Sequence, residues 1–169
     1  MKYFVLFLAF IASSSVQAQP QPADTSDWTE TEHKVHQLIS QDGIYVVHFW
    51  ATWCHNSRSE LKRGIWPRII NRNPDTEFIF VTIRDEGKTG TDVLAEYNIP
   101  EQVTILGQEE IGRSQNQRNR LFMNLPSYWT PTTWVFHKNG KLAYAINHGE
   151  VNEKAFQQLL KDLRKNWSH

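Results

Sequence analysis

Cysteine is almost absent from this chain of 169 residues, which carries a single one, Cys54. An internal disulfide and a Cys-x-x-Cys pair are both excluded, because the position three residues further on holds Ser57. The sulfur must be buried and inert, free and reactive, or joined to another molecule. Its setting favours the last two states, since the apolar run from Val46 leads into Cys54, which is predicted to open a helix. Unpaired N–H groups at a helix start stabilise a thiolate and lower the pKa of a cysteine.

Long hydrophobic runs are missing beyond residue 18. Before it, Lys2 precedes an apolar run from Tyr3 to Ala12, and the residues Val16 and Ala18 suit cleavage after Ala18. This pattern predicts a secretory signal peptide over residues 1–18 and a periplasmic or secreted protein. The run is shorter than the ~20 residues that span a bilayer. Retention of this segment as an uncleaved anchor is the alternative.

An excess of charge of either sign is also missing, because the formal net charge is zero. Nothing in this balance favours nucleic acid or an anionic membrane surface as a partner, so protein and small-molecule partners stay open. Without the signal, roughly 150 residues remain, which is a size typical of one domain. We expect a mobile leader over residues 19–26 and one domain over residues 27–169.

Hydrophobic patterning predicts alternating helices and strands. Helices are expected at residues 28–40, 57–71, 91–97 and 151–167. Ser26 or Asp27 is expected to cap the first of them, and Pro67 to kink or end the second. The stretch 108–124 is polar and basic, and Leu121, Phe122 and Leu125 are expected to dock a helix there. The strands are expected at 44–50, 78–83 and 103–106, followed by a hairpin of 132–136 and 142–146 around Asn139-Gly140. This order predicts an α/β fold with a central mixed β-sheet flanked by helices.

Two motifs in this order resemble the thioredoxin superfamily. They are Phe49-Trp50-Ala51-Thr52-Trp53-Cys54 and Trp129-Thr130-Pro131-Thr132-Thr133-Trp134, the latter followed by Asn139-Gly140-Lys141. Across residues 43–165 the chain is most similar to the exported TlpA/ResA-like branch. The resemblance implies a thioredoxin fold with an insertion between residues 86 and 125, and it implies no cofactor. It also implies a cis peptide bond at Pro131 facing Cys54, with Thr130 offering backbone hydrogen bonds to a bound peptide.

The missing second thiol restricts the chemistry that this resemblance implies. Members that cycle as dithiols use the second cysteine to resolve the mixed disulfide formed by the first, and Ser57 cannot do this. Release from Cys54 would need an external thiol such as glutathione, a second cysteine of the substrate, or a redox partner protein. Disulfide isomerisation, monothiol reduction and capture of partners as mixed disulfides remain. Ser57 could also donate a hydrogen bond to the thiolate.

Two histidines near Cys54 are candidate site residues. His48 lies six residues before the cysteine, at a strand position where thioredoxins commonly carry a buried acid. It could exchange a proton with Cys54 or pair with the thiolate, or it could be a buried neutral histidine held by one hydrogen bond. His55 is expected to be exposed, and its protonated form would stabilise the thiolate. Trp53 and Trp129 are expected to flank the site and to offer apolar surface to a peptide.

The sequence predicts no metal site. His33 and His36 have a helical spacing that suits a metal, but no third ligand is identifiable, so a solvated helix face is favoured. Arg113, Arg118 and Arg120 form a basic cluster that could contact a partner or glutathione carboxylates, although a solvated face is favoured here too.

Two functional hypotheses follow from different classes of protein. The first is an exported enzyme of thiol–disulfide exchange that acts on protein thiols or disulfides with Cys54 as its sole attacking thiolate. The second is a redox-silent adaptor or chaperone that binds an extended peptide beside Pro131 by strand addition. An enzyme requires an exposed and acidic Cys54, whereas a binding module should tolerate its replacement by alanine.

Overall fold

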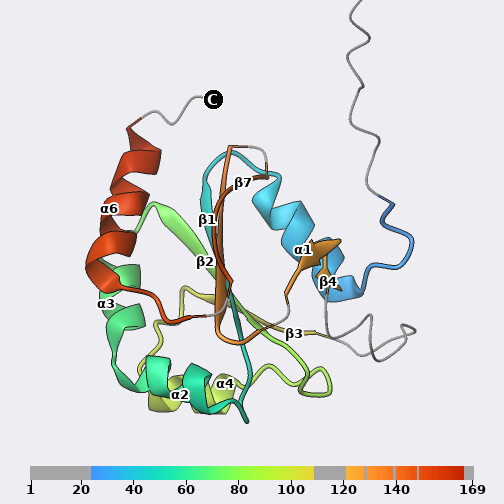
Figure 1. Ribbon diagram of the computed structural model, residues 1–169, viewed down its shortest axis with the longest axis horizontal. Helices are drawn as coiled ribbons and strands as arrows, with labels where there is room; N and C mark the ends of the chain where they lie inside the picture. Colours follow the sequence, from blue (N-terminus) through green and yellow to red (C-terminus); the bar gives the residue numbers. More distant parts are fainter. Residues whose placement is uncertain (1–23, 109–120, 128, 139, 148, 166–169) are drawn as a thin grey trace, which may run out of the picture.

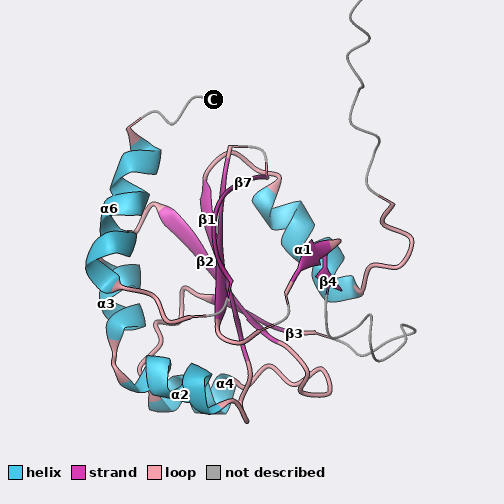
Figure 2. Cartoon of the chain, viewed as in Figure 1, coloured by secondary structure: helices cyan, strands magenta, loops and turns pink. Residues whose placement is uncertain are grey.

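A five-stranded mixed sheet forms the centre of the computed structural model, which describes residues 24–108, 121–127, 129–138, 140–147 and 149–165 (Figures 1 and 2). Its strands are β1 (Ile44–Trp50), β2 (Thr76–Thr82), β3 (Thr104–Gly107), β6 (Thr132–His137) and β7 (Lys141–Asn147), in the spatial order β3-β2-β1-β6-β7. The pairs β1–β2 and β2–β3 are parallel, whereas β1–β6 and β6–β7 are antiparallel. The predicted α/β class with a mixed sheet is confirmed. The predicted signal peptide and most of the predicted leader lie outside the described residues.

Helices cover both faces of this sheet (Figure 1). One face packs against α1 (Glu30–Ile39), and the other packs against α3 (Ile65–Asn71) and α6 (Glu153–Arg164). The helices α2 (His55–Lys62) and α4 (Thr91–Glu96) lie near one end of the sheet (Figure 1). Among the described residues, no helix combines the length and the apolar character that a membrane span requires.

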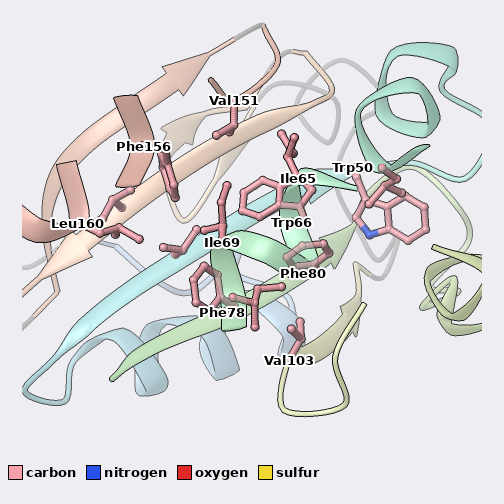
Figure 3. Packing of buried hydrophobic residues seen from close by; sticks show 14 of the residues in the cluster. Trp50, Ile65, Trp66, Ile69, Phe78, Phe80, Val103, Val151, Phe156 and Leu160 are labelled. Carbon is pink, nitrogen blue, oxygen red and sulfur yellow. The ribbon is translucent and has the colours of Figure 1, made fainter. Parts of the chain in front are cut away.

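The apolar core lies on both sides of β1, and all seven residues of this strand are buried. Its β-branched and aromatic side chains suit a strand that is covered on both faces, and the predicted bounds 44–50 are exact. Figure 3 shows the core on the α3 and α6 side, where Trp66 and Phe80 pack edge to face with ring centroids 5.2 Å apart. This packing fixes the end of β1, from which the chain continues to Cys54.

The helix predicted over residues 57–71 is two helices, and the predicted position of the break was wrong. The chain breaks at Gly64, which takes a left-handed conformation with φ of 63° between α2 and α3. Pro67 is the third residue of α3, where a backbone N–H has no partner within the helix, so the proline is accommodated. Glycine, rather than proline, therefore ends the helix that begins at the cysteine.

Two further expectations need correction. Leu121, Phe122 and Leu125 do not dock a helix but lie in a small hairpin of β4 (Leu121–Phe122) and β5 (Leu125–Pro126). The two residues of its turn have positive φ angles of 49° and 62°, as tight hairpin turns require. The cap of α1 is Thr29 rather than Ser26 or Asp27, because Thr29 and Glu32 form a capping box.

Candidate active site

Cys54 is the N-cap residue of α2, as the sequence predicted. Its extended backbone (φ −79°, ψ 118°) turns the chain from β1 into the helix, and its carbonyl accepts a hydrogen bond from the Arg58 N–H at 3.1 Å. The side chain is partly exposed. The sulfur therefore lies where the first N–H groups of a helix point and where a reactant can approach.

Hydrogen bonds favour the thiolate form of this cysteine. Partial burial alone would raise the pKa of Cys54, but hydrogen bonds from Thr130, from the N–H groups of Ser57 and Asn56 and from the Ser57 hydroxyl outweigh it, so the pKa is lowered. Ser57 is completely buried. Among the described residues, this hydroxyl has no hydrogen-bond partner other than the Cys54 sulfur, and a thiolate is a stronger acceptor than a neutral thiol.

The second sequence motif, which contains Thr130 and Pro131, lies beside Cys54 in the structure. The Thr130–Pro131 peptide bond is cis, and the Cys54 thiol contacts the Thr130 carbonyl oxygen at an Sγ···O distance of 3.5 Å. Trp53 and Trp129 are 59% and 60% exposed, whereas most of the other large apolar side chains are covered. The structure thus brings together Cys54, Ser57, Thr130 and Pro131, with an exposed tryptophan beside each motif.

His48 lies on β1, the strand that leads to Cys54, and is completely buried. Its Nδ1 is 2.9 Å from the Thr133 hydroxyl, and its Nε2 is 3.4 Å from Oε2 of Glu60. Burial lowers the pKa of His48 to about 3. The hydrogen bonds of the described residues link this imidazole to Thr133 and do not include one to Cys54. The neutral, hydrogen-bonded state is therefore the resting state of His48.

Glu60 is a residue of the site that the sequence analysis missed. It is fully buried on α2, six residues after Cys54, and its Oε1 accepts a hydrogen bond of 2.6 Å from the Val151 N–H. Burial raises the pKa of Glu60 to about 7, against hydrogen bonds from Val151 and Trp66 that lower it. In the sequence alone, Glu60 is indistinguishable from a solvated charge on a helix surface. Its position three residues after Ser57, on the same helix face, is the signal that could have found it.

Arg84 was missed as well, because nothing near it in the sequence connects it to Cys54. It follows β2, and its carbonyl oxygen accepts a hydrogen bond of 2.9 Å from the Trp53 indole nitrogen. The next residue, Asp85, accepts a hydrogen bond from the Thr52 hydroxyl. The two residues before Cys54 therefore hold the loop after β2 against the site.

The remaining candidates lie apart from this cluster or at its surface. His55 is the first residue of α2 and is exposed, as expected. His33 and His36 lie on α1, where both rings contact Trp28 with centroids 5.6 and 5.2 Å apart. In the part of the chain that the structure describes, no three His, Cys, Asp or Glu side chains gather as a metal site would require. The cluster of arginines between 113 and 120 lies outside the described residues.

Comparison with known proteins relates the chain to proteins of thiol–disulfide chemistry. No protein-family model matches it. The chain is 23% identical over 153 residues to the thiol:disulfide interchange protein DsbE of Haemophilus influenzae, in an alignment that covers 89% of this chain and 76% of that protein. The similarity therefore spans the strand, the cysteine and the proline loop together.

Solved structures share the fold. A secreted disulfide oxidoreductase of Mycobacterium tuberculosis, homologous to DsbE of E. coli, superposes with a TM-score of 0.54 at 16% identity, over 73% of this chain and 84% of that one. A thioredoxin-family thiol:disulfide interchange protein of Chlorobium tepidum gives 0.54 at 15% identity, over 75% and 83% of the two chains. A secreted thiol-disulfide isomerase of Corynebacterium glutamicum gives 0.54 at 17% identity, over 73% and 72%. The chain thus has the thioredoxin fold, and its sequence similarity supports a place in the thioredoxin superfamily.

Proposed function

We propose that this chain is an exported thioredoxin-like protein that performs thiol–disulfide exchange through Cys54 as a monothiol, in the manner of a reductase or isomerase. One observation carries the proposal: the only sulfur nucleophile is partly exposed at the start of α2, with its pKa lowered by surrounding hydrogen bonds. The similarity to a thiol:disulfide interchange protein supports the same chemistry.

The exchange proceeds by thiolate attack. The Cys54 thiolate attacks one sulfur of a protein disulfide, a new S–S bond forms to Cys54, and the other substrate sulfur leaves as a thiolate that takes a proton from water. A second attack on the mixed disulfide must come from outside, because Ser57 has no sulfur. Glutathione, another external thiol, a redox partner or the second substrate cysteine regenerates Cys54 and completes reduction or isomerisation.

Neighbouring residues have supporting roles in this proposal. Ser57 donates a hydrogen bond to the thiolate, and His55, when protonated, adds a positive charge at the exposed helix start. His48 contributes to the site in this proposal as the buried partner of Glu60, which lies on the helix that begins at Cys54. Trp53 and Trp129 form apolar walls for the substrate, and the backbone of Thr130 beside Pro131 holds an extended peptide.

Export and domain organisation belong to the same proposal. A signal peptide over residues 1–18 is removed after Ala18, a leader spans 19–26, and the thioredoxin-like domain spans 27–169. Two of the structural neighbours are described as secreted proteins. N-terminal sequencing of the exported protein tests the cleavage position, and a first residue other than Gln19 contradicts it.

A peptide-binding function without redox chemistry is the second candidate. It is favoured by two large exposed tryptophans, Trp53 beside Cys54 and Trp129 beside Thr130 and Pro131, since exposed aromatic surface is common at binding sites. This function predicts that a Cys54→Ala variant binds peptides as well as the unmodified protein does.

Trapping of mixed disulfides tests the exchange function. The reduced protein is mixed with a disulfide-bonded peptide, and the adduct is measured by mass spectrometry. We expect an adduct at Cys54 that forms faster in the folded than in the denatured protein and that dithiothreitol releases. A Ser57→Cys variant should resolve the adduct itself and gain dithiol reductase activity with insulin. Equal rates of adduct formation in the folded and denatured protein contradict the proposal.

A further inference from the structure

A groove of about 560 Å³ lies between β7 and α6. β7 is an edge strand, and among the described strands it pairs with β6 alone. The apolar residues of the groove are Tyr144 and Ile146 on β7 and Phe156 and Leu159 on α6. Phe156 also belongs to the buried core (Figure 3), whereas Tyr144 is 46% exposed. The fold therefore leaves apolar surface open to solvent at this edge of the sheet.

The loop between β7 and α6 connects this groove to the candidate active site. The Cys54 sulfur is 3.5 Å from the Thr130 carbonyl oxygen. The carbonyl of the next residue, Pro131, accepts a hydrogen bond of 3.4 Å from the Gly149 N–H. Glu150 follows Gly149 and lines the groove. An extended peptide can cover this path with about four to six residues, at about 3.3 Å for each residue.

Contacts on both sides hold this loop in place. The Val151 N–H donates to the buried Glu60 on α2 at 2.6 Å. Glu150 forms a salt bridge with Arg63, which follows α2, and Asn152 caps α6 with its side chain. The groove is therefore formed before a ligand arrives, at a fixed position relative to Cys54, and binding there needs little ordering of the chain.

The charged residues that line the groove are both acidic. They are Glu150 and Asp162. The charge of Glu150 is matched by Arg63. Asp162 accepts a hydrogen bond of 2.7 Å from the uncharged amide of Gln158, and it takes part in none of the salt bridges between described residues. Apolar walls with an unmatched carboxylate at the rim fit an apolar side chain that stands next to a lysine or an arginine.

We propose that the groove between β7 and α6 binds a segment of the protein substrate, and this proposal rests on the thiol–disulfide exchange function. The segment carries an apolar side chain next to a lysine or an arginine, about four to six residues from the reacting cysteine. Its binding holds the substrate disulfide beside Cys54, so the attack of the thiolate becomes effectively intramolecular. The groove thus selects among protein disulfides, whereas a small disulfide reaches the sulfur without touching it.

Peptides that differ only in the groove segment test this substrate class. Each peptide carries one cysteine as a mixed disulfide with mercaptoethanol and, about five residues away, either a leucine-lysine or a serine-glutamate segment. One pair of peptides places the segment before the cysteine, and a second pair places it after. The rate of adduct formation at Cys54 is divided by the rate with glutathione disulfide. We expect leucine-lysine to react about five- to tenfold faster in one pair, and equal rates in both pairs overturn the proposal.

Variants locate the preference in the groove. Tyr144→Ser and Asp162→Asn should each reduce the preference for leucine-lysine at least threefold. Leu142→Ser is the apolar control, because Leu142 is an exposed residue of β7 that does not line the groove. Glu77→Gln is the charge control, because Glu77 is exposed at the start of β2, far along the sheet from Cys54. Both controls should keep the preference, and a preference that survives in both groove variants overturns the proposal.

Binding without exchange separates the groove from the reaction at Cys54. A leucine-lysine peptide whose cysteine is replaced by serine is added to the ¹⁵N-labelled Cys54→Ala variant, and amide shifts are recorded by NMR. We expect shifts at Tyr144, Ile146 and Leu159. Shifts confined to the surroundings of Pro131, or none, overturn the proposal. Shifts in the groove while the unmodified protein reacts with no disulfide support the groove and reject the exchange function alone.

Sedimentation of the unmodified protein tests the other occupant of such a groove, a second copy of the chain. We expect a monomer at the concentrations of these assays. A dimer that Tyr144→Ser dissociates would show that the groove is covered by another copy, and this result overturns the proposal. Circular dichroism verifies the folding of each variant, and Asp162→Asn, which changes an exposed side chain, keeps the test decisive if Tyr144→Ser does not fold.

Discussion

Replacing Glu60 with glutamine should make folding stability sensitive to acid between about pH 6.5 and 4.5. In the folded protein His48 is neutral, with a pKa of about 3, and Glu60 is protonated, with a pKa of about 7. In the unfolded chain the ordinary values of 6.5 and 4.5 apply, so His48 is protonated in this window and Glu60 is ionised. Both states of the unmodified protein therefore hold one proton on the pair, and its contribution to stability does not change with pH.

The Glu60→Gln variant loses this balance. Its unfolded state holds a proton on His48 below about pH 6.5, whereas its folded state does not, because the depressed pKa of the buried imidazole is retained. The unfolded state then binds one proton more, and the free energy of unfolding falls by about 1.4 kcal/mol for each pH unit of acidification. Over two pH units the variant should lose about 2–3 kcal/mol relative to the unmodified protein.

The reciprocal variant should show the opposite slope. In His48→Asn the folded state keeps the proton of Glu60 between about pH 4.5 and 7 and the unfolded state does not, so acidification should increase its stability relative to the unmodified protein. Urea unfolding at pH 4.5, 5.5 and 6.5 measures both slopes, and the double variant should run parallel to the unmodified protein. If both single variants run parallel to the unmodified protein, the folded state does not hold a neutral His48 beside a protonated Glu60.

Two further predictions concern the packing that positions the site. Gly90→Ala should lower stability by about 2–3 kcal/mol, because its φ is +66° and a Cβ there would lie 2.7 Å from the Trp50 ring. Gly87→Ala, with φ of +75° but no atom within 4 Å of its Cβ, is the matched control and should lose less. Phe156→Ala removes a side chain that is 2% exposed and should cost about 3–5 kcal/mol. Urea unfolding measures all three, and equal losses in the two glycine variants would contradict the first prediction.

The fold was predictable from the sequence wherever local pattern and tertiary context agree. The seven residues of β1 are β-branched or aromatic with a single histidine among them, and a strand buried on both faces is the structure such a run favours. The helix break was not predictable from Pro67, because a proline in the first turn of a helix is tolerated and Gly64 provides the left-handed residue instead.

The site was predictable only in part, for a different physical reason. Cys54 and Pro131 belong to motifs whose spacing carries information. Glu60 and Arg84 are ordinary charges in the sequence, and they become parts of the site through contacts with residues distant along the chain. The Val151 N–H and His48 hold Glu60, and the Trp53 indole holds the backbone of Arg84. Such contacts leave no periodic pattern in the sequence.

The pH dependence of Cys54 alkylation by iodoacetamide, in the folded protein and in denaturant, tests the central claim most directly. Hydrogen bonds from Thr130, Ser57 and Asn56 lower the pKa of Cys54 against the effect of partial burial, so the folded protein should titrate at a lower pH than the denatured chain. The Ser57→Ala variant should shift part of the way back. A folded-state pKa equal to or above that of the denatured chain, or a thiol that does not react in the folded protein, would contradict a thiolate nucleophile at Cys54.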